Sequence, residues 1–399
     1  MKLILLFDLD DTLLTNKMEA FEPAYVKALA KHLSKYVDPI RLIQQLGYAT
    51  QQMTRNQRPD QTQENVFDRS FYPALGLNRQ DIQPDIDIFY QDVFPGLRDL
   101  TRPRPEAIDM VKEALADGHT VVIATNPLFP YTATFQRLSW AGLSPEENPI
   151  SIVSTYETFH FAKPNPAYYA EIIAQLGWPN SPIIMIGNDL DMDIAPAQQM
   201  NFNTFWISNG DTPGNYLPTA SGSFTDLSQW IKQISFMPIE TYSDPQSMTS
   251  ILQSTPAALN TLIHQQDVNL LKQRPRQEEW SLTEIICHLR DVETEVNLPR
   301  LQKICSENNP FLPGINTDEW AQTRAYNQED GIQALAGFTE ARIDVLNLLN
   351  QLGPDGWGKT ARHAIFGPTE IKELVSFMVT HDRTHLQQIK CTIDQISGN

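Results

Sequence analysis

The sequence contains little cysteine. Cys287, Cys305 and Cys391 are the three cysteines among its 399 residues, and no two of them have a C-x-x-C spacing. Three cysteines cannot build a disulfide framework, and their spacing does not match the usual cysteine zinc sites or redox pairs. The composition therefore predicts a protein of a reducing compartment.

Long hydrophobic runs are also lacking. The apolar run at residues 3–7 ends at Asp8, which makes it too short for the core of a signal peptide. No other stretch approaches the roughly 18 consecutive apolar residues that a membrane span requires. We expect no membrane partner and a cytoplasmic location.

Basic residues are outnumbered by acidic ones. The chain has 30 Lys and Arg against 48 Asp and Glu, which gives a formal net charge of −18 at pH 7. This charge repels nucleic-acid phosphates and anionic lipid headgroups. We therefore expect no nucleic-acid partner, whereas a small phosphorylated metabolite held through a metal ion is compatible with the charge.

Short apolar runs alternate with helical patterns over the first 234 residues. Such runs, apolar on both faces and separated by helices, are typical of parallel strands. They predict an α/β fold with a Rossmann-like parallel sheet. Its strands are expected at residues 3–7, 121–124, 151–153, 183–186 and 204–207.

The chain length allows two to three domains. The insert at residues 15–100 is too long for a simple connection and has helical periodicity, so it predicts a helical cap inserted in a core made of residues 1–14 and 101–236. Residues 237–249 contain Pro, Ser and Asp without periodicity and are expected to be a linker. Four helical patterns over residues 250–399 predict an all-α four-helix bundle.

Two carboxylates follow the first predicted strand. Asp8 and Asp10 lie in the segment Asp-Leu-Asp-Asp-Thr at the carboxyl end of that strand, where open α/β sheets bind ligands. One carboxylate can attack phosphorus while the other protonates the leaving oxygen and later deprotonates water. Taken alone, this segment has a capped helix start after a strand as its alternative explanation.

Three further segments carry polar side chains in a matching order. Thr125 ends the second strand, Lys163 lies in Lys-Pro-Asn-Pro, and the segment from Gly187 to Asp193 follows the strand at residues 183–186. With Asp8 and Asp10, these segments resemble those of the haloacid dehalogenase-like hydrolase superfamily with a helical cap, over residues 1–234.

The resemblance implies a role for each of these residues. Asp8 would be the nucleophile that forms an aspartyl-phosphate, Asp10 the general acid and base, Thr125 a hydrogen-bond donor to the phosphoryl group, and Lys163 its counter-charge. It also implies a Mg²⁺ ion held by Asp8, Asp189 and the main-chain carbonyl of Asp10, with Asp193 orienting Lys163 or a metal-bound water.

Asp10 separates two reactions of this superfamily. An alcohol needs a proton as it leaves and a halide does not, so Asp10 favours phosphoester hydrolysis over dehalogenation. Phosphomutases use the same residues, and this alternative stays open. We expect a Mg²⁺-dependent phosphatase acting on a small phosphorylated metabolite.

Three histidines lie on the apolar faces of predicted bundle helices. His288 lies beside Ile285 and Leu289. His381 and His385 continue an apolar stripe with alternating steps of three and four residues, which starts at residue 371. Because unpaired imidazoles are costly on such a face, a shared metal ion is a plausible reason for their presence.

The segments around these histidines resemble the DinB-like family of metal-binding four-helix bundles, over residues 250–395. They are Arg-Pro at residues 274–275, Glu-Trp-Ser-Leu-Thr-Glu at 279–284, His-Leu-Arg-Asp at 288–291 and His-Asp-x-x-His at 381–385. The resemblance implies a divalent ion, Zn²⁺ or Ni²⁺, held by His288, His381 and His385. Glu284 and Asp382 are interpreted as solvated helix charges, with hydrogen bonding to the histidines as the alternative.

The function of the bundle stays open between two further hypotheses. Some DinB-like relatives transfer low-molecular-weight thiols to electrophiles, which would make the bundle a metal-dependent thiol transferase. A non-catalytic bundle used for dimerisation or partner binding is the other hypothesis, and a homodimer is compatible with it.

Overall fold

The computed structural model describes residues 1–208, 210–317 and 319–397. The chain divides into two compact units. The first contains residues 1–57, 61–168 and 180–240, and the second contains residues 58–60, 169–179 and 241–399. None of the described helices is both long and apolar enough to cross a membrane.

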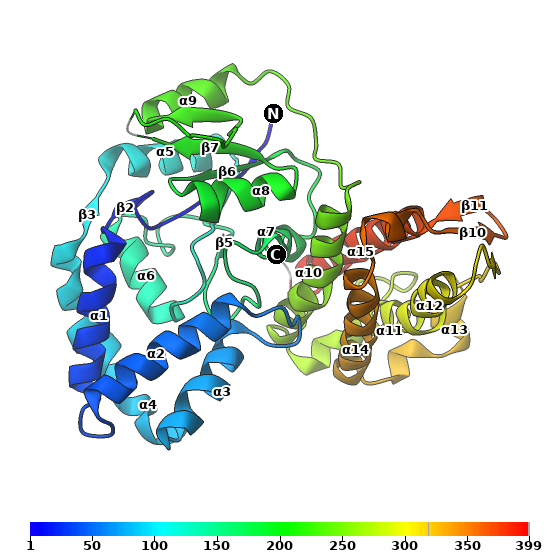
Figure 1. Cartoon of the computed structure of the whole chain (residues 1–399), viewed down its shortest axis with the longest axis horizontal. Helices are drawn as coiled ribbons and strands as arrows, with labels where there is room; N and C mark the ends of the chain where they lie inside the picture. The colour runs from blue at the N-terminus through cyan, green and yellow to red at the C-terminus, as the bar shows by residue number, and fades with distance from the viewer. Residues whose placement is uncertain (209, 318, 398–399) are drawn as a thin grey trace. The chain divides into compact units, whose positions relative to one another are not determined.

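A six-stranded parallel sheet forms the centre of the first unit (Figure 1). The strand order is β5-β4-β1-β6-β7-β8, and every neighbouring pair is parallel. The strands are β1 (Ile4–Phe7), β4 (Thr120–Ile123), β5 (Ile152–Val153), β6 (Ile183–Gly187), β7 (Asn203–Ile207) and β8 (Ala220–Gly222). The predicted α/β parallel sheet is confirmed. Strand β8 is an additional edge strand that the apolar runs of the sequence did not predict.

Helices connect the strands of this sheet. They are α5 (Pro105–Ala116), α6 (Tyr131–Trp140), α7 (Pro166–Gln175) and α8 (Ala195–Gln199), and α9 (Phe224–Gln233) follows the last strand, β8. Helix α9 begins at a capping box, in which the Ser223 hydroxyl and the Asp226 carboxylate each accept the other residue's backbone N–H. The strands β1, β4 and β6 are buried on both faces, which explains their continuous apolar runs.

The insert between β1 and α5 is helical. Its helices are α1 (Met18–His32), α2 (Pro39–Thr54), α3 (Gln63–Leu75) and α4 (Arg79–Ile88), followed by a π-helical turn (Phe89–Val93) and a 3-10 helix (Phe94–Leu100). Figure 1 shows α1 to α4 gathered to one side of the six-stranded sheet. Helices α2, α3 and α4 begin at side-chain caps from Asp38, Thr62 and Asn78.

A two-stranded antiparallel ribbon joins the two ends of this insert. Strand β2 (Leu14–Thr15) pairs with β3 (Arg102–Pro103). Just beyond β3, the Arg104 guanidinium donates to the carbonyls of Asp11 and Thr12, at 3.0 and 3.1 Å. The helical insert therefore begins and ends at one place beside the six-stranded sheet.

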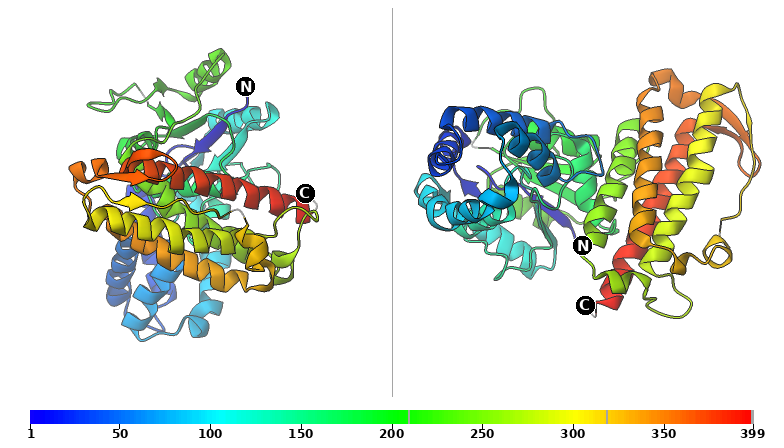
Figure 2. Two further views of the ribbon diagram at one scale, coloured as in Figure 1. Left: turned by 90° about the vertical axis from the view of Figure 1, so that its right-hand side faces the viewer. Right: turned by 90° about the horizontal axis from the view of Figure 1, so that it is seen from below.

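Four long helical segments lie side by side in the second unit (Figure 2). They are α10 (Pro245–His264), α11 (Leu282–Val292) continued through the π-helical turn Glu293–Asn297 into α12 (Leu298–Ser306), α14 (Gly331–Asn350) and α15 (Ile371–Ile396). Ser281 caps α11 with the capping box that its sequence indicates. Helix α10 starts at Pro245, within the segment expected to be linker.

The second unit also contains short elements between its long helices. Strands β9 (Phe311–Leu312), β10 (Thr360–His363) and β11 (Gly367–Glu370) form a small sheet in the order β11-β10-β9. A short helix, α13 (Trp320–Thr323), and 3-10 turns at Val268–Lys272, Tyr326–Gln328 and Pro354–Gly358 complete the connections. Such short elements are too brief to produce a periodic sequence pattern.

Candidate functional site

The register of three neighbouring strands brings the predicted site segments of the first unit together. Phe7 at the end of β1 pairs with Ile123 of β4 and with Ile186 of β6. The residues that follow these three positions therefore leave the sheet at the same edge. They include Asp8, Thr125 and the segment from Gly187 to Asp193.

Lys163 bridges two of the predicted carboxylates. Its ammonium nitrogen lies 2.7 Å from Oδ1 of Asp8 and 2.6 Å from Oδ1 of Asp193, and all three side chains are buried. Burial raises the pKa of Asp193 to about 7, and the lysine charge opposes this rise. This fixed ammonium is therefore placed to neutralise an anion that approaches Asp8.

A glycine makes room for the Asp193 carboxylate. A Cβ at Gly187 would lie 2.2 Å from Oδ2 of Asp193, closer than side-chain atoms can approach. The same Oδ2 accepts the backbone N–H of Asp189 at 3.1 Å. Asp193 is thus held by backbone on one oxygen and by Lys163 on the other.

The Thr125 hydroxyl is buried, and its oxygen has no hydrogen-bond partner among the described residues. The threonine is held by its backbone, because its carbonyl accepts from Ser154 Oγ and from the Tyr168 hydroxyl, each at 2.7 Å. An unpaired buried hydroxyl is costly unless a ligand satisfies it. Its position beside the edge that carries Asp8 suits a phosphoryl oxygen.

Asp10 lies in a tight loop that the side chain of the next residue, Asp11, stabilises by hydrogen bonds. Asp11 has a positive φ of 54°, and its Oδ1 accepts the backbone N–H groups of Asn16 and Lys17, both at 3.0 Å. The Asp10 carboxylate is partly exposed and accepts a hydrogen bond from the side-chain amide of Asn16. The loop therefore presents Asp10 at the boundary between sheet and cap.

Arg137 is a site residue that was not predicted from the sequence. This residue of α6 is fully buried, forms an ion pair with Asp10, and places its guanidinium 5.5 and 4.8 Å from the ring centroids of Phe21 and Phe129. Burial lowers the pKa of its guanidinium to about 10. Its position in the same helical stripe as Ala133, one turn earlier and also buried, was the available signal.

Asp189 is the exposed member of the predicted set. Its Oδ1 accepts the backbone N–H groups of Asp191 and Met192, both at 2.9 Å, and so caps the turn that follows β6. Mg²⁺ commonly takes one or two protein carboxylates and keeps several waters. The donor set of Asp8 and Asp189 at one sheet edge fits such an ion.

The three bundle histidines converge. Nε2 of His381 lies 3.2 Å from Nε2 of His288 and 3.2 Å from Nε2 of His385. Across the described part of the chain, this is the one group of three or more His, Cys, Asp or Glu residues whose ligand atoms all lie within 4.8 Å of one another. Three imidazole nitrogens that meet at one point fit a divalent ion such as Zn²⁺.

The electrostatics of the trio suit a ligand set. Burial lowers the pKa of His288 to about 4, and it lowers the pKa values of His381 and His385 as well. Neutral imidazole is the form that donates its lone pair to a metal. Nδ1 of His385 lies 2.9 Å from Oε1 of Gln388, a contact that orients the ring.

The interpretation of Glu284 and Asp382 as solvated charges is wrong. Both carboxylates are buried, and each pairs with an arginine that compensates its charge. Glu284 accepts from Arg274, and Asp382 accepts from the fully buried Arg342, which also binds Glu293. Both carboxylates form ion pairs with arginines, so these pairs stabilise the bundle next to the histidines.

Two classes of protein are defined by these features: an α/β sheet protein with a carboxylate and lysine cluster, and a helical bundle with a histidine cluster. Residues 3–201 match the family model of the haloacid dehalogenase-like hydrolases, and residues 251–389 match that of the DinB superfamily. Residues 3–201 therefore belong to the haloacid dehalogenase-like hydrolases, and residues 251–389 belong to the DinB superfamily.

Solved structures resemble each part separately. A HAD phosphatase from Thermococcus onnurineus is 17% identical, with 58% of this chain and 98% of that chain covered and a TM-score of 0.39. A 2-haloacid dehalogenase from Pseudomonas syringae pv. Tomato DC3000 is 21% identical, with 58% and 99% covered and a TM-score of 0.41. YfiT from Bacillus subtilis, a four-helix bundle, is 18% identical, with 41% and 94% covered and a TM-score of 0.36. No curated protein matches the chain.

Trp280 provides a reporter for the histidine trio. Its ring centroid lies 5.1 Å from that of His288 and 6.2 Å from that of His385, with which it is stacked. We expect Ni²⁺ or Co²⁺ to quench its fluorescence because an open-shell ion bound by these rings would lie close to the indole. The measurement is a fluorescence titration of the full chain.

Its control is the Trp280→Phe variant. If the metal-dependent quenching persists undiminished in that variant, the ion binds elsewhere.

Proposed function

We propose that the first unit hydrolyses phosphomonoesters through an aspartyl-phosphate intermediate, with Mg²⁺ as cofactor. The observation that carries this proposal is the buried Lys163 bridging Asp8 and Asp193 beside the unpaired hydroxyl of Thr125. Together they offer a nucleophile, a counter-charge and a hydrogen-bond donor to one phosphoryl group. Mg²⁺, when bound, supplies positive charge that lets an anionic carboxylate approach an anionic phosphate.

The residues of this chain divide the reaction into two steps. In the first, Asp8 attacks phosphorus while Asp10 donates a proton to the leaving alkoxide. In the second, Asp10 takes a proton from water, which attacks the phosphorus and frees Asp8. Lys163 and Thr125 hold the phosphoryl oxygens throughout.

Phosphate release from a panel of phosphomonoesters, measured with Mg²⁺ and with excess chelator, tests the proposal. Release that requires Mg²⁺ supports it. Chloride release from 2-chloropropionate without phosphatase activity would instead assign the unit to dehalogenation.

Arg137 is proposed to position Asp10. We expect Arg137→Met to lower kcat/KM for an alkyl phosphate by about 10- to 100-fold, because Asp10 loses the cation that holds it next to the leaving group. An aryl phosphate, whose leaving group needs no proton, loses much less. Parallel assays with both substrates measure this difference.

Arg137→Lys keeps the positive charge and is the matched variant. It is expected to restore part of the alkyl phosphate activity. Equal losses for both substrates in Arg137→Met would reduce Arg137 to a packing role.

For the second unit we propose a divalent metal site with an open coordination position. The three convergent nitrogens of His288, His381 and His385 support this, because catalytic zinc sites commonly have three protein ligands. A thiol bound at the open position would make the bundle a metal-dependent thiol transferase. Transfer of a low-molecular-weight thiol to an electrophile, assayed with and without added Zn²⁺ or Ni²⁺, tests this function, and inactivity of the metal-loaded chain leaves a structural metal site.

A further inference from the structure

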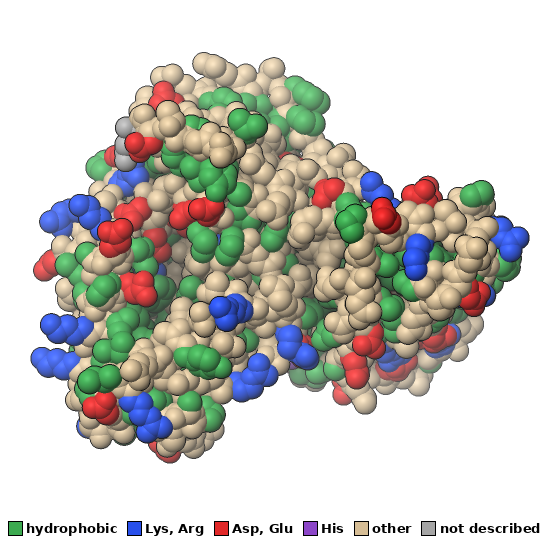
Figure 3. All heavy atoms as spheres, in the orientation of Figure 1, with side chains coloured by type: hydrophobic (Ala, Val, Ile, Leu, Met, Phe, Trp, Pro, Cys, Tyr) green, Lys and Arg blue, Asp and Glu red, His purple; other side chains and the backbone are tan. Residues whose placement is uncertain are grey.

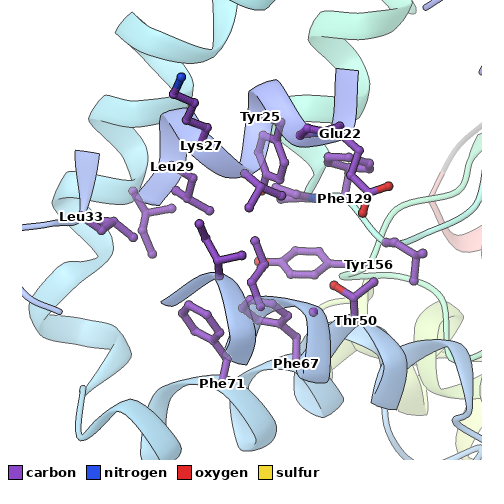
Figure 4. Close-up of a pocket in the computed structure, with 18 of the residues that line it drawn as sticks. Glu22, Tyr25, Lys27, Leu29, Leu33, Thr50, Phe67, Phe71, Phe129 and Tyr156 are labelled. Atoms are coloured by element: carbon purple, nitrogen blue, oxygen red, sulfur yellow. The ribbon is translucent and has the colours of Figure 1, made fainter. Parts of the chain in front are cut away.

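A large cavity lies between the cap helices and the loop after β4. Its volume is about 790 Å³, within the roughly 300–1,000 Å³ of pockets that hold small organic molecules. Figure 4 shows Tyr25 and Leu29 on one side, Phe67 and Phe71 on the other, and Tyr156 between them. The cavity thus has walls from α1, α2 and α3 and from parts of the first unit outside the helical insert.

The walls of this cavity are aromatic and aliphatic. Among its lining residues, Glu22 and Lys27 are the charged ones, both are exposed, and Figure 4 shows the Lys27 amine turned away from the cavity. The hydroxyls of Tyr25 and Tyr90 bind each other at 2.9 Å. By contrast, acidic and basic side chains are interspersed on the outer face of the cap that Figure 3 shows. The interior therefore offers no counter-charge for a second anionic group.

Two lining residues connect the cavity to the catalytic acid. Met18 accepts a contact from the Asn16 amide at 3.5 Å, and the same amide binds Asp10. Phe129, another lining residue, stacks against the Arg137 guanidinium, which pairs with Asp10. The cavity therefore borders the residues that hold Asp10, the proposed proton donor to the leaving alcohol.

We infer that this cavity binds the leaving group and that the substrate is a phosphomonoester of a bulky, predominantly apolar alcohol. This inference rests on the proposed phosphatase function. Burying the apolar alcohol against these walls supplies binding energy that polar sugar phosphates cannot obtain there. Substrates with a second phosphate or carboxylate would leave that charge without a partner.

Gly47 offers a way to fill the cavity without disturbing its walls. It lines the cavity from the middle of α2, and a Cβ placed there would meet no described atom beyond its immediate chain neighbours and its own helix backbone within 4 Å. The Cβ of Gly47→Phe therefore lies in open space at a position that lines the cavity. Gly47→Ala is the matched control, because it makes the same backbone change with little added volume.

The experiment compares three primary alkyl phosphates on the full chain with Mg²⁺: 2-(2-naphthyl)ethyl phosphate, ethyl phosphate and glucose 6-phosphate. Their leaving alcohols have similar acidity, so differences in kcat/KM report binding of the alcohol portion. We expect the naphthylethyl ester to exceed both others by about 100-fold or more. Gly47→Phe removes this preference because it lowers kcat/KM for the naphthylethyl ester much more than for ethyl phosphate, and Gly47→Ala retains it.

Equal kcat/KM values for the three esters, or a preference for glucose 6-phosphate, overturn the inference. Absence of all phosphate release overturns the proposed function instead. Calorimetric titration with 2-(2-naphthyl)ethanol then tests separately whether the cavity binds an apolar alcohol. Binding to the wild-type chain that Gly47→Phe abolishes supports an apolar occupant, and no binding to the wild type contradicts it.

Discussion

Replacing Asp8 by Asn is expected to lower phosphate release by at least about 1,000-fold while the protein stays folded. The amide cannot act as the attacking oxygen nucleophile, whereas its size matches the carboxylate that Lys163 binds at 2.7 Å. Lys163 and Thr125 still bind the phosphate group, so substrate affinity falls much less than turnover. Phosphate release under saturating substrate, with the melting temperature as a check on folding, measures the effect.

Asp11→Asn is the matched control for this variant. Asp11 uses one carboxylate oxygen to accept two backbone N–H groups, and an asparagine oxygen can accept the same bonds and tolerates the same positive φ. Its activity should stay within about threefold of wild type. Near-normal turnover in the Asp8→Asn chain would refute the aspartyl-phosphate route.

Replacing His381 by Ala is expected to weaken divalent-ion binding by at least about 100-fold, because this residue lies within 3.2 Å of both other histidines. The stabilisation that Zn²⁺ gives to the wild-type chain against thermal unfolding should disappear with it. Metal titration followed by calorimetry and by the melting temperature measures both effects on the full chain.

His264→Ala is the control for the bundle. This exposed histidine of α10 contacts the carbonyl of Asn260 in its own helix and is not part of the histidine trio, so its loss should leave metal affinity unchanged. Both variants should keep wild-type phosphate release. Unchanged metal affinity in the His381→Ala chain would show that the three imidazoles are packing residues.

The fold could be predicted where single elements carry their own signal. Strands β1, β4 and β6 are buried on both faces and therefore appear as unbroken apolar runs, and the capping box at Ser281 marks the start of α11. Strand β8 and the strands β9 to β11 have only two to four residues each. Elements of this length are too short to produce a periodic pattern from which they could be predicted.

The candidate sites follow the same division. Asp8 was found because it follows an apolar strand, and His381 and His385 because they occupy an apolar helical stripe. Arg137 was missed because burial of a charge is decided by its distant partner Asp10 and by two aromatic rings. The buried ion pair of Asp382 with Arg342, which joins two helices, was not predicted for the same reason.

The β2–β3 ribbon connects the inserted helices to the loop that carries Asp10. The loop that carries Asp10 runs directly into β2, and Arg104 fastens the other strand of the ribbon to the backbone of Asp11 and Thr12. Any movement of the inserted helices about this ribbon would therefore also displace the loop that carries Asp10. A bulky alcohol that draws these helices around itself would, by the same movement, bring Asp10, the proposed proton donor, to the oxygen that it would protonate.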